Sequence, residues 1–222
     1  MTTTELSPEL LTALGDLETP TVSDALDRLG IPGQCLGIMP LDRGFKMAGP
    51  AFTVKYCDDY VTGGSVGDFV DDIAPGQVAV LDNRGRLDVT VWGDLMTILA
   101  GRKGVAGTVV DGVCRDVRRA LALDYPLFTR GNWMRTGKDR VQLEAVGVPV
   151  EIGGVVVRPG DVLVGDANGV VAVPAHRAEE VLEVSRDIEA AEERIREQVQ
   201  NGVSLREARK QAGYHSLQTR VG

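Results

Sequence analysis

The middle of the chain alternates short apolar segments with helical ones, and this alternation constrains the fold more than any other feature. Residues 77–85 and 105–110 have the Val-rich composition of strands, and a helical pattern starts at Asp94 between them. A second helical pattern over 114–124 leads into another strand over 125–131. Strands that alternate with helices are typical of α/β proteins. The 222 residues suffice to bury a core of that kind, so we expect an α/β fold.

Helices are also expected at the start of the chain. One covers 7–14, with Ser7 as the capping residue, and a second covers 19–30, with Thr21 or Ser23 as the cap. Both segments space their apolar residues as one face of a helix does.

The rest of the chain predicts strands followed by helices. Residues 46–57 form a strand, and 147–174 form a run of short strands separated by glycine turns. One long helix is expected over 176–200. We therefore predict a single domain over 1–200 and a helical tail over 201–222, whose last part is loose.

One pattern occurs twice. "PGQVAVLDNRG" at 75–85 and "PGDVLVGDANG" at 159–169 share Pro-Gly-x-Val-x-Val-x-Asp-x-x-Gly. A Pro-Gly turn, a strand and a second turn explain both copies, so we interpret the repeat as one structural device used twice rather than as a functional repeat.

Charge and composition exclude several classes of protein. The net charge of −8 argues against binding a nucleic-acid backbone. Cys35, Cys57 and Cys114 form no C-x-x-C pair, which argues against a disulfide framework or a zinc knuckle. No apolar run approaches the roughly 18 residues of a membrane span, and no signal peptide is recognisable. We expect a cytoplasmic protein that binds neither nucleic acid nor membrane.

The first candidate site is the junction "VWGDLM" at 91–96. A strand ends at Trp92, Gly93 permits an unusual backbone angle, and Asp94 can cap the helix that follows. The amides of Leu95 and Met96 would then be free to bind a carboxylate or phosphate. The alternative is that Asp94 is only a helix cap.

The second candidate site lies in "VVDGVCRDVRR" at 109–119. A strand runs into Asp111 and Gly112, and a helix from about Cys114 would place Arg115 and Asp116 in its first turn. The helix dipole disfavours an arginine there, which indicates an anionic ligand or partner. Asp116 is suited to a hard cation such as Mg²⁺. The alternative is an Asp116 cap beside a surface salt bridge from Arg115.

The residues and motifs that other catalytic or nucleotide-binding mechanisms need are missing from the sequence. His176 and His215, the only histidines, lie in polar C-terminal sequence, and no G-x-S-x-G, P-loop or G-x-G-x-x-G motif is present. Cys114 has no obvious base nearby, so we interpret it as a packing thiol.

A family resemblance emerges from these segments. "WGDLMTILAGRKGVAGTVVDGVCRDVRRALALDYPLF" at 92–128 resembles the signature region of the RraA-like family, close to its class II 4-hydroxy-4-methyl-2-oxoglutarate / 4-carboxy-4-hydroxy-2-oxoadipate aldolases. "TPTVSDALDRLG", "MAGPAFTV" and "VRPGDVLVGDANGVVAVP" agree, so the likeness spans about 19–200. It implies a β/β/α layered fold like the phosphohistidine swivelling domain, with a helical C-terminal arm. It also implies trimers or hexamers and a divalent metal, Mg²⁺ or Mn²⁺.

The resemblance also implies roles for individual residues. Asp116 resembles the metal-binding carboxylate, Arg115 the residue that meets the pyruvyl group, and Asp94 the partner of a metal-bound water. The substrate-contacting positions it implies are Gly93, Leu95, Met96 and Arg115.

Two segments bear on the neighbouring subunit and the substrate. The aldolases use a glutamate from the C-terminal helix of a neighbouring subunit, and Glu192 fits its spacing best among Glu189, Glu192, Glu193 and Glu197. Where close aldolases carry a Gly-Asp-Asn element, this chain departs and reads "VTGGSVGDFVDD" at 61–72.

The expected activity is a metal-dependent retro-aldol cleavage. The substrate would be a small anionic oxo acid, a 4-hydroxy-2-oxo dicarboxylate or tricarboxylate, and the products pyruvate and a second oxo acid. Oxaloacetate decarboxylation is the expected side activity. Two alternatives stay open: an RraA-like regulator that binds and inhibits an RNA-processing endonuclease, and a lyase for a sugar-derived oxo acid.

Overall fold

The structure is a computed structural model that describes residues 6–58 and 65–213. The helices are α1 (Pro8–Asp16), α2 (Thr19–Arg28), η1 (Asp68–Asp72), α3 (Asp94–Lys103), α4 (Val117–Ala122), η2 (Ala175–Arg177), α5 (Ala178–Gln200) and α6 (Leu205–Gln211). The strands are β1 (Met39–Pro40), β2 (Met47–Asp58), β3 (Val78–Thr90), β4 (Gly107–Cys114), β5 (Leu127–Asn132), β6 (Val141–Val146), β7 (Val150–Ile152), β8 (Val155–Val157), β9 (Val162–Asp166) and β10 (Gly169–Val173).

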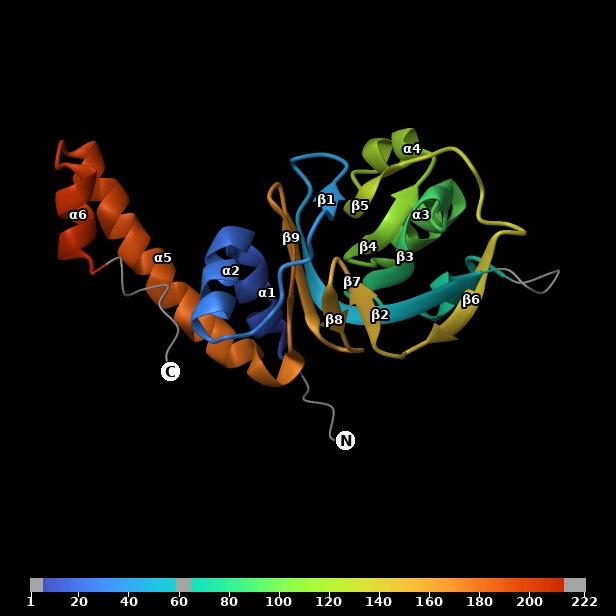
Figure 1. The fold of residues 1–222 in the computed structure, drawn as a ribbon, viewed down its shortest axis with the longest axis horizontal. Coiled ribbons are helices and arrows are strands. Elements are labelled where there is room, and N and C mark those ends of the chain that lie inside the picture. Colours follow the sequence, from blue (N-terminus) through green and yellow to red (C-terminus); the bar gives the residue numbers. More distant parts are fainter. Residues whose placement is uncertain (1–5, 59–64, 214–222) are drawn as a thin grey trace.

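A mixed sheet forms the centre of the molecule (Figure 1). Strands β2, β3, β4 and β5 run parallel and adjacent, as α/β connections through α3 and α4 require. The long strand β2 pairs antiparallel with β9 near its start and with β6 near its end. Strand β10 continues the sheet beyond β9, and β1 pairs with β5 at the other edge. The expected α/β fold is confirmed.

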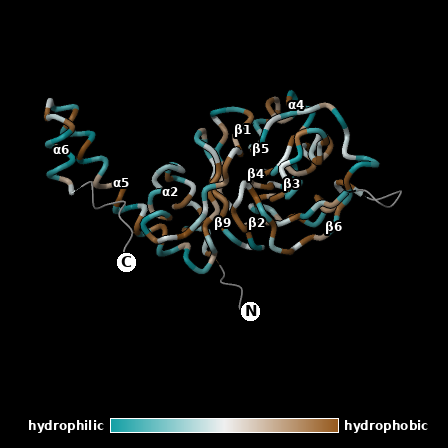
Figure 2. The backbone as a smooth tube through the Cα atoms, viewed as in Figure 1, coloured by the Kyte–Doolittle hydropathy of each residue, from teal (hydrophilic) through white to brown (hydrophobic). Residues whose placement is uncertain are grey.

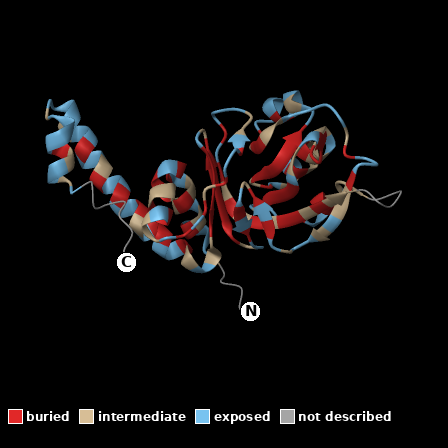
Figure 3. Cartoon of the chain, in the orientation of Figure 1, coloured by how far each residue is buried: buried red, intermediate tan, exposed pale blue. Residues whose placement is uncertain are grey.

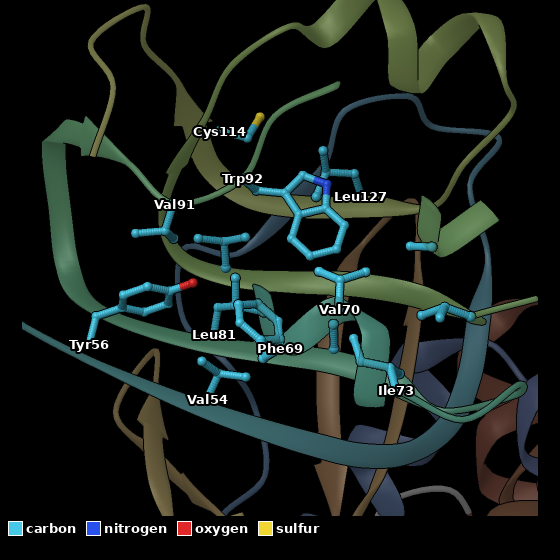
Figure 4. Packing of buried hydrophobic residues seen from close by; sticks show 14 of the residues in the cluster. Val54, Tyr56, Phe69, Val70, Ile73, Leu81, Val91, Trp92, Cys114 and Leu127 are labelled. Carbon is cyan, nitrogen blue, oxygen red and sulfur yellow. The ribbon is translucent and has the colours of Figure 1, made fainter. Parts of the chain in front are cut away.

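Both faces of the parallel strands are buried, which explains their continuous apolar sequence. Alternate residues face opposite sides, because side chains of a strand alternate. Leu81 and Val110 belong to a core beneath α3 and η1, shown in Figure 4. Val80 and Val109 belong to a second core, shared with the β7–β8 hairpin. The hairpin covers one face of the sheet and the helices cover the other. This is the β/β/α layering that the resemblance implies.

A third core attaches the remaining helices. Helix α1 packs on β9, helix α2 packs on β9 and β10, and α5 packs in turn on α1 and α2. Figure 2 shows hydrophobic residues concentrated along the sheet, and Figure 3 shows the same strands buried. The far end of α5 extends away from the body together with α6 and is largely exposed (Figures 1 and 3). This is the expected helical C-terminal arm, and the boundary placed at residue 200 stays a prediction.

The repeated Pro-Gly pattern is the structural device that the sequence indicates. Gly76 and Gly160 both adopt positive φ angles, of 78° and 86°, in the turns that precede β3 and β9. Glycine adopts this conformation without the strain that a Cβ causes.

The predicted cap of the second helix and the predicted start of the long C-terminal helix are wrong. Helix α2 begins at Thr19, so Thr21 and Ser23 lie inside it; the buried Asp166 carboxylate accepts from Thr19 N (2.8 Å) and Oγ1 (2.6 Å) instead. This cap comes from a strand 147 residues away, which local sequence does not reveal. Helix α5 begins at Ala178, after a 3₁₀ turn, rather than at His176.

The predicted end of the strand and the predicted start of the helix at the second junction are also wrong. Strand β4 continues to Cys114 and α4 begins only at Val117, because the strand still pairs with β5 at Cys114. Arg115 and Asp116 therefore lie in the connection before α4, not in its first turn. The expected loose end falls on residues 214–222, which include His215 and lie outside the described residues.

Candidate active site

The two junctions meet in space because the strands that precede them are neighbours. The Arg115 N–H donates to the Trp92 carbonyl oxygen at 3.0 Å, which ties the two connections together. The Asp94 N–H donates to Asp116 Oδ2 at 3.2 Å, across 22 residues of sequence. The structure therefore places Asp94, Arg115 and Asp116 side by side.

Asp116 has an unusual backbone conformation. Its φ of 59° and ψ of 34° are left-handed, a region that Asp tolerates better than most residues but that still costs energy. Its carboxylate makes no capping bond to α4 and instead accepts from the first amide of α3. Asp116 is thus the N-cap residue of α4 by position and does pair with Arg115, as the alternative expected, but its side chain does not cap that helix. Strain of this kind is characteristic of functional sites.

Arg115 lies against the same carboxylate oxygen. Its Nε is 3.3 Å from Asp116 Oδ2, and about 40% of each side chain is exposed. At that exposure the ion pair adds little to stability. The pair does orient the guanidinium and the carboxylate toward one cavity, which is the property that a binding site needs.

Gly93 is the N-cap of α3, and Asp94 is the first residue of the helix rather than its cap. A Cβ on Gly93 would lie 2.9 Å from Asp116 Oδ2 and 3.3 Å from Arg115 Nε. The approach of the two side chains to this backbone therefore requires glycine. Its φ of −147° is extended, so close approach and not backbone freedom is the reason.

The two amides expected to bind a carboxylate differ. Leu95 N donates to Asp94 Oδ1 at 2.8 Å, so this amide is used within the protein. Met96 N has no acceptor among the described residues and points out of the helix N-terminus. In this structure one of the two amides is available to a ligand.

Trp92 and Thr97 hold the first junction from behind, and the sequence interpretation did not identify this. The Trp92 Nε1–H donates to Thr97 Oγ1, whose hydroxyl donates to the Gly93 carbonyl, both at 2.9 Å. The buried Trp92 indole stacks on Tyr125, with centroids 6.2 Å apart (Figure 4 shows Trp92). A tryptophan before the glycine and a threonine five residues later is the signal that could have indicated it.

Two cavities adjoin at these residues. The larger, of about 890 Å³, is lined by Asp116 and the α4 side chains, and the smaller, of about 330 Å³, by Trp92 and Met96. Asp94 and Arg115 line both cavities. A ligand that extends through both would have its middle at Asp94 and Arg115.

The acidic residues of the site bear on the expected divalent metal. The described part of the chain contains no group of three or more His, Cys, Asp and Glu that could hold an ion. Asp116 and Asp94 are the carboxylates of the site. Mg²⁺ commonly binds through one or two carboxylates and keeps several waters, so these two residues fit a hydrated ion completed by ligand oxygens.

Other predicted positions lie elsewhere. Asp111 points to the opposite face of the sheet, where it is buried, pairs with Arg130 and accepts from Gly153 N at 3.0 Å. Cys114 is buried, and burial raises the pKa of its thiol to about 11, as a packing residue requires. Helix α5, which carries Glu192, extends away from α3 and α4 (Figure 1); Glu192 pairs with Arg196 at 3.2 Å and lines a hollow with Leu205 of α6. Within one chain, Glu192 does not reach the site.

The structure describes only part of the segment at 61–72 that departs from the aldolase pattern. Residues 61–64 are outside the described residues, and the remainder leads into η1, whose Phe69 and Val70 are buried in the core beneath α3. Val66, just before η1, lines the smaller cavity. This segment therefore contributes packing and one apolar wall in place of the missing element.

The fold and these junctions define an RraA-type α/β protein. Residues 19–172 match the model of the RraA-like family, described as Aldolase/RraA. The chain belongs to this family.

Two curated relatives illustrate the range of the family. Protein DlpA of Legionella pneumophila is 39% identical over 93% of this chain, but the chain spans only about a third (34%) of that protein. A protein of Halalkalibacterium halodurans named "Putative 4-hydroxy-4-methyl-2-oxoglutarate aldolase" is 35% identical over 83% of this chain and 86% of its own length.

Solved structures confirm the fold. An uncharacterized protein from Pseudomonas syringae pv. tomato superposes with a TM-score of 0.87 at 42% identity, over 93% of this chain and 99% of that one. RraAS2 of Streptomyces coelicolor, described as an unusual member of the RNase ES inhibitor RraA protein family, superposes with a TM-score of 0.77 at 32% identity, over 85% and 96%. Among the described residues, none of the helices has both the length and the apolar character to cross a lipid bilayer.

Proposed function

We propose that the chain is a divalent-metal-dependent pyruvate aldolase. It would cleave a 4-hydroxy-2-oxo dicarboxylate or tricarboxylate to pyruvate and a second oxo acid, and it would decarboxylate oxaloacetate as a side activity. The observation that carries the proposal is the meeting of Arg115, Asp116 and the α3 N-terminus at two joined cavities. The aldolase names of relatives about 35% identical support it.

The smaller cavity suits the pyruvyl end of such a substrate. The substrate carboxylate would accept a hydrogen bond from the free Met96 N–H at the helix N-terminus, where the helix dipole favours an anion. The apolar groups of Val66 and Val91 would surround its C3 carbon. The scissile C3–C4 bond then lies beside Asp94 and Arg115, which line both cavities.

The chain's own groups account for the movement of protons and charge. The Asp94 carboxylate takes up the proton of the C4 hydroxyl, directly or through one water, as the C3–C4 bond breaks. The electron pair of that bond moves onto the pyruvyl C2 oxygen, where the Arg115 guanidinium stabilises the enolate. Protonation of C3 then gives pyruvate. A divalent ion held by Asp116 would supply Lewis-acid stabilisation of the same oxyanion.

The proposal extends to the assembly. Glu192 lies on the α5–α6 arm, beside Leu205 and not among the residues that line the two cavities, so a contribution from it requires a neighbouring subunit in a trimer or hexamer. We propose a cytoplasmic homo-oligomer, and the oligomeric state is measurable by light scattering.

A coupled assay tests the activity. Pyruvate release from 4-hydroxy-4-methyl-2-oxoglutarate, 4-carboxy-4-hydroxy-2-oxoadipate and oxaloacetate is followed with lactate dehydrogenase, in the presence of Mg²⁺ or Mn²⁺ and then of a chelator. Asp116→Asn should lower kcat/KM by about a hundredfold or more, the magnitude expected for loss of an electrostatic stabiliser.

Asp124→Asn is the matched control. Asp124 also has a positive φ, of 50°, and lies at the other end of α4, so asparagine preserves the left-handed backbone at either position. Full turnover of both Asp116→Asn and Arg115→Ala would refute the mechanism. Absence of pyruvate from every substrate, with a folded protein and added metal, would favour a binding protein of the kind that the RraAS2 description names.

A further inference from the structure

Arg118 and Arg119 of α4 are two cations without an assigned role. Both are exposed, and both line the larger cavity next to Arg115 and Asp116. Among the ion pairs of the described residues, neither guanidinium has a carboxylate partner. Unpaired arginines that face a binding cavity are suited to anions, since the guanidinium binds a carboxylate through two parallel hydrogen bonds.

The charge of this cavity contrasts with that of the whole chain. The protein carries a net charge of −8, yet the larger cavity presents three arginines and only two aspartates. Asp116 is already paired with Arg115, and Asp94 offsets only one of the two remaining cations, so the cavity keeps a net positive charge on the α4 side. Local positive charge of this kind attracts polyanionic ligands despite the opposite charge of the whole molecule.

The layout of the two cavities says which part of a substrate would meet these arginines. When the pyruvyl end lies at Met96 in the smaller cavity, the C4 carbon and its substituents extend into the larger one. A dicarboxylate brings one carboxylate there, on C4. A tricarboxylate brings two, one on C4 and one on its acetate arm, which matches the number of unpaired arginines.

We propose that Arg118 and Arg119 determine substrate specificity, and that the preferred substrate is a 4-hydroxy-2-oxo tricarboxylate. The two guanidiniums bind the two carboxylates beyond the scissile bond. This inference rests on the proposed function and adds to it the identity of the acid at the distal end. The methyl-substituted dicarboxylate would bind with one of the two arginines unused.

The test is a comparison of two substrates. For wild type, Arg118→Gln, Arg119→Gln and the double variant, kcat/KM is measured on 4-carboxy-4-hydroxy-2-oxoadipate and on 4-hydroxy-4-methyl-2-oxoglutarate. Wild type should favour the tricarboxylate, and the double variant should lose roughly tenfold of that preference, as expected for an exposed charged hydrogen-bonded pair. Arg119→Lys should retain part of it, because the charge remains while the planar fork is lost.

Arg102→Gln on α3 is the control, since Arg102 is exposed and lines neither cavity. Its substrate preference should equal that of wild type. An active wild type whose preference is unchanged by the double variant would overturn this inference and leave the aldolase proposal standing. Equal losses on both substrates would also overturn it. No pyruvate from either acid with wild type would instead refute the proposed function, and the inference with it.

Discussion

Replacement of Gly93 by alanine should separate activity from stability. The added Cβ would lie 2.9 Å from Asp116 Oδ2, closer than real Cβ contacts come, and 3.3 Å from Arg115 Nε. Both atoms are near the ends of partly exposed side chains, so they can move aside. That movement breaks the hydrogen bond of 3.2 Å that the Asp116 carboxylate accepts from the Asp94 amide.

The effect on folding should be small. The φ of Gly93 is −147°, which alanine adopts without strain. Alanine at an N-cap lowers the free energy of unfolding by about 1 kcal/mol relative to the residues preferred there. Because alanine also reduces the conformational entropy of the unfolded chain, it raises that free energy by about 0.4–1 kcal/mol. The net change should stay within about 1 kcal/mol, which corresponds to a shift of about 2–4 °C in Tm for a chain of this size.

The effect on catalysis should be much larger. A displacement of about 1 Å at a reacting group costs on the order of a hundredfold in rate, so kcat/KM for pyruvate release should fall by about that factor. Mn²⁺ affinity, measured by titration calorimetry, should fall too, because Asp116 is the proposed ligand.

Gly101→Ala is the matched control in the same helix. Its Cβ would meet nothing closer than Tyr125 Cδ2 at 3.8 Å, so it should raise stability by about 0.5–1 kcal/mol and leave activity intact. If Gly93→Ala retains wild-type activity and Mn²⁺ affinity, the position of Asp116 is not critical and the reasoning is refuted.

Two further predictions concern pH and thiol chemistry. Burial raises the pKa of Asp166, but hydrogen bonds led by those from Thr19 outweigh it and hold the pKa below its ordinary value of 3.8. Asp166→Ala should therefore lower the free energy of unfolding, measured with urea at pH 7, by about 2 kcal/mol. The difference from wild type should shrink as the pH falls below about 3.8 and through the pKa of the folded state. A difference that stays constant down to pH 2 would contradict this. Burial raises the pKa of Cys35 to about 12 and that of Cys114 to about 11, so at pH 8 the half-buried Cys57 should react first with a maleimide in the native protein, and the other two only after unfolding. Labelling of all three at one rate, followed by mass spectrometry, would contradict the buried positions.

The sequence determined the elements and their order. Strand and helix periodicities depend on neighbouring residues, so the α/β class, the helix beginning at Asp94 and the turns at Gly76 and Gly160 could be predicted directly. The residue types at the two junctions also indicated an anion and a cation site, because the chemistry of Arg115 and Asp116 does not depend on the fold.

Only the tertiary structure decided which groups meet. Asp166 caps α2 from a distant strand, Asp111 turns away from the junction that it precedes, and Asp116 accepts from the amide of Asp94 rather than from its own helix. Each of these contacts is set by which strands lie side by side and by which face a side chain takes. The sequence alone does not specify these, because the free energy of pairing and burial depends on residues far apart in the chain.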